Sequence, residues 1–211
     1  MSIGLTGCHR TGKTTLAKAY AEEHGVVFCP TKTTEVFERL GMDPKAEYPL
    51  EQRLDIQEAI LESLIEQYIA CGERVFITDR TPLDLAAYTL TEVYRGVEMT
   101  PETEDRLRHY INRCFDLTNL WFGLIMLIKP GIPAEEGVLK GPNSYGYVEH
   151  YAAVIMGLVS DERTAVNHFY MKSTVLDLQE RVNCLHNTIQ MVQRRQMEDA
   201  LYDENGFAVV H

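Results

Sequence analysis

Short apolar segments alternate with longer amphipathic stretches along the chain. The short segments are rich in β-branched residues, and the longer stretches repeat their apolar positions with the period of a helix. This alternation is typical of an α/β protein, in which helices connect the strands of a mainly parallel sheet. We therefore predict a five-stranded sheet, with strands at residues 2–6, 26–30, 74–79, 124–129 and 165–171.

Several of the predicted helices have recognisable start and stop signals. A long helix between the second and third strands is expected to end at Gly72, a typical stop residue. Two more helices are predicted to start at Thr81 and Thr100, since each threonine precedes a proline. Asp84 occupies the acidic position of a capping box behind Thr81, which explains this residue without a catalytic role. A last helix is predicted over about residues 174–200.

A glycine-containing loop connects the first strand to the first helix. Residues 7–14, with the sequence GCHRTGKT, match the P-loop pattern G-x-x-x-x-G-K-[ST] at every fixed position. In such a loop, backbone N–H groups surround phosphate oxygens at a helix N-terminus. Lys13 is expected to bind the β- and γ-phosphates of ATP, and the Thr14 hydroxyl to bind Mg²⁺. The predicted nucleotide-binding residues here are Gly7, His9, Arg10, Thr11, Gly12, Lys13, Thr14 and Thr15.

The third predicted strand ends in the pair Asp79 and Arg80. Ligands of open α/β sheets gather at the carboxyl ends of parallel strands, so Asp79 is expected beside the P-loop. Two roles are open for its carboxylate there: to hold Mg²⁺, or to accept the hydroxyl proton of a phosphate acceptor. Arg80 either binds a phosphate or acceptor group through its guanidinium, or is a solvated surface arginine. The predicted catalytic residues are thus Lys13, Asp79 and Arg80, and the predicted metal ligands are Thr14 and Asp79.

The composition and charge of the chain indicate which classes of ligand it favours and in which compartment we expect it. The 211 residues carry a formal net charge of −11, which disfavours nucleic acid as a partner because its phosphates are normally met by a basic surface. No apolar run approaches the roughly eighteen residues of a membrane span, and the N-terminus lacks signal-peptide features. The five cysteines are scattered without metal-ligand spacing. We therefore expect a cytoplasmic protein with free thiols and a single domain over residues 1–211, and leave its oligomeric state open.

The P-loop, taken together with residues 78–84 (TDRTPLD), resembles the P-loop nucleoside and nucleotide kinases. The sequence is most similar to the nicotinamide-riboside-kinase-like group, which includes phage and bacterial members. The resemblance covers residues 1 to about 185 and implies a three-layer P-loop NTPase fold with the P-loop strand central. It matches Lys13 and Thr14 to the phosphate and Mg²⁺ residues, and Asp79 and Arg80 to the acidic–arginine pair near the acceptor.

The resemblance also implies a lid after the fourth strand, at about residues 130–160. This segment is rich in proline and glycine in its first half, which is typical of a functional loop. Kinase lids usually carry several arginines, whereas this one offers Lys140, with Arg163 just beyond it, as candidate nucleotide-binding cations. Glu35 follows the second strand, where such kinases often have an acceptor-binding acid, although an exposed acid in a first helical turn is common.

Three functions fit these observations. The first is a kinase in nucleotide metabolism, which transfers the γ-phosphate of ATP to a hydroxyl or phosphate of a nucleoside- or nucleotide-like molecule. The second is a kinase that acts on a modified base or a strand end in nucleic acid, which the acidic net charge disfavours. The third is an ATP-dependent switch or binding protein, for which the segment 130–160 is a partner-binding loop. The sequence does not identify the acceptor.

Overall fold

A parallel sheet of five strands forms the centre of the protein. The computed structural model describes residues 1–44, 46–93, 98–131 and 144–201. The strand order is β2-β3-β1-β4-β5, and every pairing is parallel, so the strand that precedes the P-loop is central. The fold class predicted from the sequence is confirmed. The strands are β1 (Ile3–Thr6), β2 (Val27–Cys29), β3 (Phe76–Thr78), β4 (Leu124–Ile128) and β5 (Asn167–Met171).

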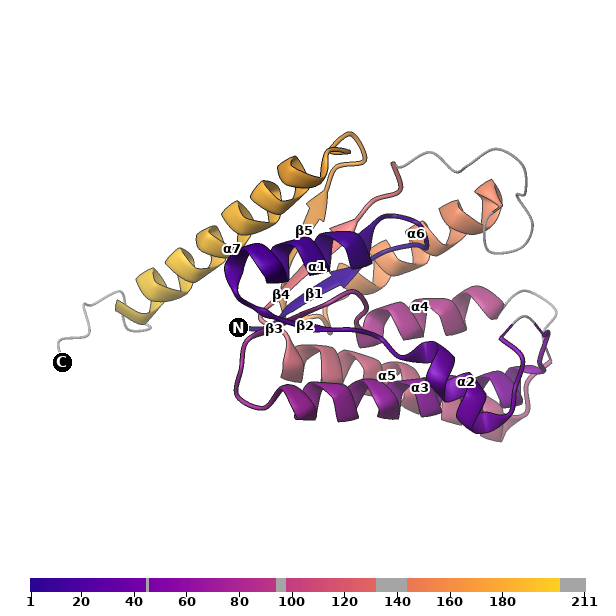
Figure 1. The fold of residues 1–211 in the computed structure, drawn as a ribbon. Helices are drawn as coiled ribbons and strands as arrows, with labels where there is room; N and C mark the ends of the chain where they lie inside the picture. The colour runs from indigo at the N-terminus through magenta and orange to yellow at the C-terminus, as the bar shows by residue number, and fades with distance from the viewer. Residues whose placement is uncertain (45, 94–97, 132–143, 202–211) are drawn as a thin grey trace.

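Helices cover both faces of this sheet (Figure 1). Alternate side chains of β4 point to opposite faces: Met126 joins the apolar cluster under α1 (Lys13–His24) and α7 (Leu178–Leu201), whereas Ile125 joins the larger cluster on the other face. Both clusters are apolar, so the sheet is buried on its two sides, as parallel sheets require. The helices of the larger cluster are α2 (Thr33–Leu40), α3 (Leu50–Cys71), α4 (Pro82–Glu92), α5 (Pro101–Trp121) and α6 (Tyr145–Val159).

The predicted helix starts are confirmed in two cases and wrong in one. Thr81 and Asp84 form the expected capping box of α4, and the Thr100 side chain caps α5. The last helix begins at Leu178, four residues later than predicted, because the Asp177 carboxylate accepts the Glu180 N–H at 2.9 Å and so ends the preceding loop.

The structure describes the second half of the segment 130–160, which was predicted to be a lid. Residues 145–159 form the regular helix α6, which packs on α4 with Tyr151 and Ile155 buried. Proline and glycine lie in the first half of the segment, and the second half has the apolar spacing of a core helix. Residues 132–143, which include Lys140, lie outside the described residues.

Two further observations concern the whole described chain. None of the described helices is long and apolar enough to cross a membrane. The five cysteines are free thiols, as expected, and four of them are buried.

Candidate active site at the phosphate-binding loop

Two glycines allow the P-loop to turn between β1 and α1. Gly7 has φ 137°, and a Cβ atom there would collide with the carbonyl oxygen of Ile128 at the end of β4. Gly12 is the N-cap of α1 with φ 74°, a left-handed conformation that glycine adopts without strain. Arg10 also has a positive φ, 59°, within the loop. The loop therefore wraps closely around the N-terminus of α1, where N–H groups are free to bind an anion.

Lys13 lies inside this loop. Its Nζ atom donates hydrogen bonds to the carbonyl oxygens of Gly7 and Cys8, at 2.6 and 2.7 Å. Burial lowers the pKa of Lys13, while the negative charge of Asp84 acts in the opposite direction. Two carbonyl groups thus hold the ammonium group over the loop. When a phosphate binds, its negatively charged oxygens would take the place of these carbonyl oxygens as acceptors.

Thr14 and Asp79 come from different elements and meet at the start of α1. The Thr14 hydroxyl donates a hydrogen bond of 2.5 Å to Asp79 Oδ2. The other oxygen, Oδ1, accepts the hydroxyl of Thr31 at 3.0 Å and the Thr31 N–H at 3.3 Å. Thr31 follows β2 and Asp79 follows β3, so the carboxyl ends of two neighbouring strands fix this carboxylate beside the loop.

Arg80 and His9 contact the same aromatic ring. The Arg80 guanidinium lies 5.0 Å from the ring centroid of Tyr88, a cation–π contact, and the His9 ring centroid lies 4.9 Å from it. Arg80 is therefore not the solvated surface arginine of the alternative reading. Burial, together with the positive charges of Arg80 and Lys13, lowers the pKa of His9 to about 4. His9 is consequently neutral at pH 7, so one ring nitrogen is available as an acceptor.

Asp84 has a second role that the sequence analysis missed. Besides capping α4, its buried carboxylate accepts the Gly7 N–H and the Tyr151 hydroxyl through Oδ1, both at 3.0 Å. Oδ2 accepts the N–H and hydroxyl of Thr81, at 2.8 and 3.0 Å. One carboxylate thus connects the P-loop to α4 and α6. The capping-box pattern identified the local partner but gave no sign of the distant ones.

The P-loop also has a contact with the last helix. The Thr11 hydroxyl donates to the Cys8 carbonyl at 3.0 Å, and the Thr11 carbonyl accepts a hydrogen bond of 2.6 Å from Arg181 of α7. No motif in the sequence marks Arg181. The loop is therefore fixed by side chains from both faces of the sheet.

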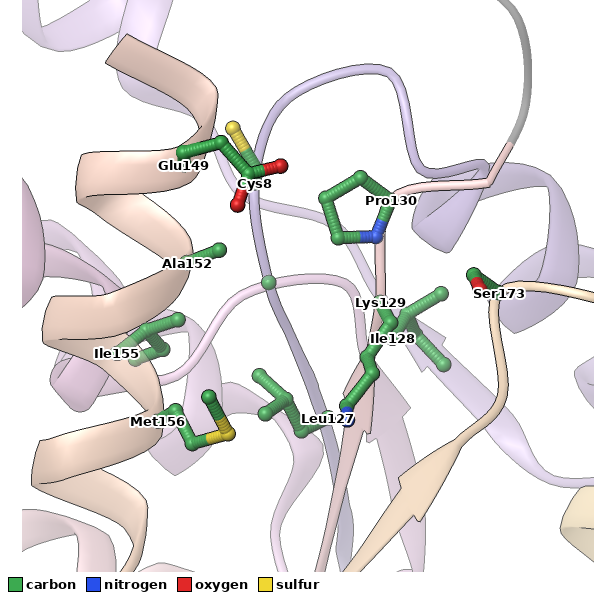
Figure 2. A pocket seen from close by; sticks show the side chains of 11 residues that line it. Cys8, Leu127, Ile128, Lys129, Pro130, Glu149, Ala152, Ile155, Met156 and Ser173 are labelled. Atoms are coloured by element: carbon green, nitrogen blue, oxygen red, sulfur yellow. The ribbon is translucent and has the colours of Figure 1, made fainter. Parts of the chain in front are cut away.

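A cavity of about 240 Å³ lies between the P-loop and α6 (Figure 2). Gly7 and Cys8, the end of β4 and the side chains of Glu149, Ile155 and Met156 line it. It borders the loop on the β4 side, whereas Asp79 follows β3, on the other side of β1 in the sheet. A ligand at the loop therefore has a carboxylate on one side and a partly apolar cavity on the other.

Two of the predicted site residues lie apart from the loop. Glu35 pairs with Lys32 at 3.3 Å and lines a surface hollow against α3. Arg163 pairs with Asp161 at 2.8 Å and stacks over Phe115 of α5, with its guanidinium 4.0 Å from the ring centroid. Arg163 lies between the end of α6 and the start of β5, at the amino ends of the parallel strands. The P-loop follows the carboxyl end of β1, so the structure does not place Arg163 at the nucleotide site.

Solved structures with similar folds include kinases. A deoxyadenosine kinase from M. mycoides with bound dATP has a TM-score of 0.60 at 16% sequence identity, covering 90% of this chain and 100% of that chain. The YorR protein from Bacillus subtilis, in complex with phosphorylated GDP, has a TM-score of 0.52 at 10% identity, covering 92% and 98%. At these identities, the similarity establishes a shared fold.

Sequence comparison adds the family. No curated protein matches the chain significantly. A family model described as an AAA domain matches residues 2–122, which contain the P-loop, Asp79 and Asp84. Because the match spans more than half of the 211 residues, the chain belongs to this AAA domain family.

Proposed function

We propose that this protein is an ATP-dependent phosphotransferase that moves the γ-phosphate of ATP to a hydroxyl or phosphate of a small nucleoside- or nucleotide-like molecule. The observation that carries the proposal is the 2.5 Å hydrogen bond between the Thr14 hydroxyl and the Asp79 carboxylate. A P-loop hydroxyl and a strand-end carboxylate side by side are the pair expected to bind the metal and the reacting groups.

The chemistry of this pair suits Mg²⁺. Both residues offer hard oxygen donors, which Mg²⁺ prefers over nitrogen or sulfur. The described residues contain no group of three or more histidine, cysteine or acidic side chains that would form an all-protein metal cage. Mg²⁺ commonly binds through one or two protein oxygens together with substrate phosphates and water. When bound, it would neutralise charge on the β- and γ-phosphates.

The chain's own residues then have distinct tasks. The backbone N–H groups of the loop bind phosphate oxygens, and Lys13 exchanges its carbonyl partners for the β- and γ-phosphates. Asp79 lies where it can hold the metal or accept a proton from the attacking hydroxyl. Arg80, held over the Tyr88 ring, presents a fixed positive charge toward the acceptor side. Catalysis on this scheme comes from positioning and electrostatic stabilisation.

The acceptor class rests on two supports. The sequence of the P-loop and of residues 78–84 resembles the nicotinamide-riboside-kinase-like group, and the fold is shared with a deoxyadenosine kinase. The cavity beside Gly7, lined in part by Ile155 and Met156, offers apolar surface for a base or similar ring. We therefore propose nicotinamide riboside and deoxynucleosides as the first acceptors to test.

The decisive experiment is a screen of acceptors with γ-labelled ATP and Mg²⁺. The purified protein is incubated with ribonucleosides, deoxynucleosides, their monophosphates and nicotinamide riboside, and transfer of label is measured for each. We expect rapid labelling of one small acceptor, lost in Lys13→Ala and retained in Lys18→Ala, a control on the exposed face of α1. Labelling of oligonucleotides alone would replace the proposal with a nucleic-acid kinase. ATP hydrolysis that no acceptor accelerates would replace it with a switch.

A further inference from the structure

Arg181 is a buried cation that touches the P-loop from outside the family-matched region. It lies in the second turn of α7, whereas the AAA domain model ends at residue 122. Its side chain is 4% exposed, and its Nη2 atom donates a hydrogen bond of 2.6 Å to the Thr11 carbonyl. A charge is rarely buried to this degree without an opposite charge beside it, because burial removes its hydration.

The charge of Arg181 has no counter-ion within residues 1–44, 46–93, 98–131 and 144–201. No ion pair in this part of the chain involves it, and its Nε–H is buried without a hydrogen-bond partner. Burial lowers the pKa of Arg181, and no carboxylate opposes that effect. Two arginines of α5 behave differently: Arg106 pairs with Asp55 and Glu58, and Arg113 pairs with Glu62.

We infer that Arg181 is a positioning residue of the nucleotide site, and that the polyphosphate of a bound nucleotide supplies its missing counter-charge. The inference rests on the nucleotide binding proposed above. By holding the Thr11 carbonyl toward α7, Arg181 fixes the peptide groups that follow, so that their N–H groups face the anion side of the loop. Its charge, kept from water, adds to the positive field there.

Two effects separate this role from simple packing. A buried cation without a partner destabilises the unliganded protein, so its removal should not lower the stability of the apo protein. The same removal should weaken the binding of an anionic ligand. A purely structural residue would show the reverse, with lower apo stability and unchanged affinity per folded molecule.

The test uses Arg181→Gln, which removes the charge and keeps a shorter polar side chain. The probe is AMP-PNP with Mg²⁺, with affinity measured by calorimetry and the melting temperature measured with and without the probe. We expect roughly tenfold weaker binding and an apo melting temperature equal to or above that of the wild type. Arg181→Lys, which restores a positive charge, should recover part of the affinity. Arg194→Gln, an exposed arginine on the same helix, is the matched control and should bind like the wild type.

Other outcomes would overturn the inference. Unchanged affinity in Arg181→Gln, or a loss explained by unfolding of the apo variant, would refute it while nucleotide binding stands. A wild-type protein that does not bind AMP-PNP would refute both the inference and the proposed function. A wild-type protein that binds AMP-PNP but phosphorylates no acceptor would refute the proposed function alone.

If the glutamine variant does not fold, the wild-type protein decides the question by NMR of arginine Nε–H groups. The Arg181 signal should shift on addition of AMP-PNP, and the Arg194 signal should not. Absence of a shift at Arg181 would overturn the inference.

Discussion

The P-loop is held by two regions of the chain that use opposite chemistry. The family-matched region, residues 2–122, supplies two carboxylates, Asp79 and Asp84, which accept hydrogen bonds from the loop and its helix. The region after residue 144 supplies two donors, Tyr151 and Arg181, which reach the same assembly from α6 and α7.

The residues that take part in the proposed reaction therefore differ from the residues that fix the shape of the loop. Asp79 shares a hydrogen bond with a hydroxyl that is expected to bind metal, so it is part of the proposed reacting centre. Tyr151 acts through Asp84, and Arg181 acts through a backbone carbonyl, so neither needs to touch the transferred phosphate. We therefore expect substitutions of Lys13 and Asp79 to change rate most, and substitutions of Asp84, Tyr151 and Arg181 to change affinity or stability by smaller amounts.

The largest expected effect is that of Lys13→Ala. We predict a loss of transfer rate of about a thousandfold or more, because the variant removes the charge that stabilises the transferring phosphate. The fold should persist, since the hydrogen bonds of Lys13 go to the loop itself. Single-turnover transfer and thermal unfolding, measured on the same preparation, check both parts. Near-normal turnover would remove the P-loop from the mechanism.

The second effect is that of Asp79→Asn, for which we predict at least a hundredfold lower turnover. Asparagine keeps the size of the side chain and one acceptor oxygen, so the substitution tests charge. Binding of AMP-PNP with and without Mg²⁺ separates the two open roles: a metal ligand loses the Mg²⁺-dependent part of the affinity, and a proton acceptor keeps it. Glu22→Gln, an exposed acid on α1, is the control.

Local patterns predicted the fold and the position of Asp79 beside the P-loop, for physical reasons. The carboxyl ends of parallel strands lie on the same side of the sheet. A carboxylate that follows β3 must therefore lie near a loop that follows the neighbouring strand β1. The capping box of α4 was also visible, because its partners, Thr81 and Asp84, lie three residues apart. These features depend on neighbours in the chain or on the direction of a strand, and both can be recognised from a short stretch of the sequence.

The remaining features depend on contacts between distant segments. Arg181 lies 170 residues from its partner Thr11, and Tyr151 lies 67 residues from Asp84, so no short pattern joins them. The assignment of Arg163 failed for a related reason. Arg163 follows the predicted lid closely in sequence. However, α6 returns the chain to the amino ends of the strands, where the parallel strand β5 must begin.

A third prediction tests the junction between the two regions. Asp84→Asn should lower the free energy of unfolding by about 2 kcal/mol, because the amide NH₂ cannot accept the hydrogen bonds that the carboxylate accepts. Four donor groups surround this carboxylate, from Gly7, Thr81 (two) and Tyr151. Urea unfolding measures the loss. Asp177→Asn, which alters one exposed helix cap, should cost less than 1 kcal/mol by the usual scale of such caps. Equal losses in the two variants would show that Asp84 is an ordinary cap.

The smallest predicted effect is that of Tyr151→Phe, which removes one donor from the same carboxylate. The Tyr151 hydroxyl donates to Asp84 Oδ1 at 3.0 Å, and burial raises the pKa of Tyr151 well above its usual value, so the donor proton remains at any working pH. The ring should stay in place, because it packs on Tyr88 with centroids 4.6 Å apart. We expect a loss of about 1 kcal/mol in the free energy of unfolding, the usual value of one hydrogen bond, with an unchanged urea m-value.

The hydrogen bond also predicts that these two substitutions are not additive. In Asp84→Asn the Tyr151 hydroxyl has already lost its carboxylate acceptor, so adding Tyr151→Phe should cost clearly less than it does in the wild type. A double-mutant cycle by urea unfolding measures this coupling. Tyr145→Phe, an exposed tyrosine on the same helix, should leave stability unchanged and serves as the control. Full additivity would mean that α6 contributes to the P-loop through packing and not through Asp84. AMP-PNP affinity should change less than about threefold in Tyr151→Phe, since Gly7 keeps its own hydrogen bond to the carboxylate.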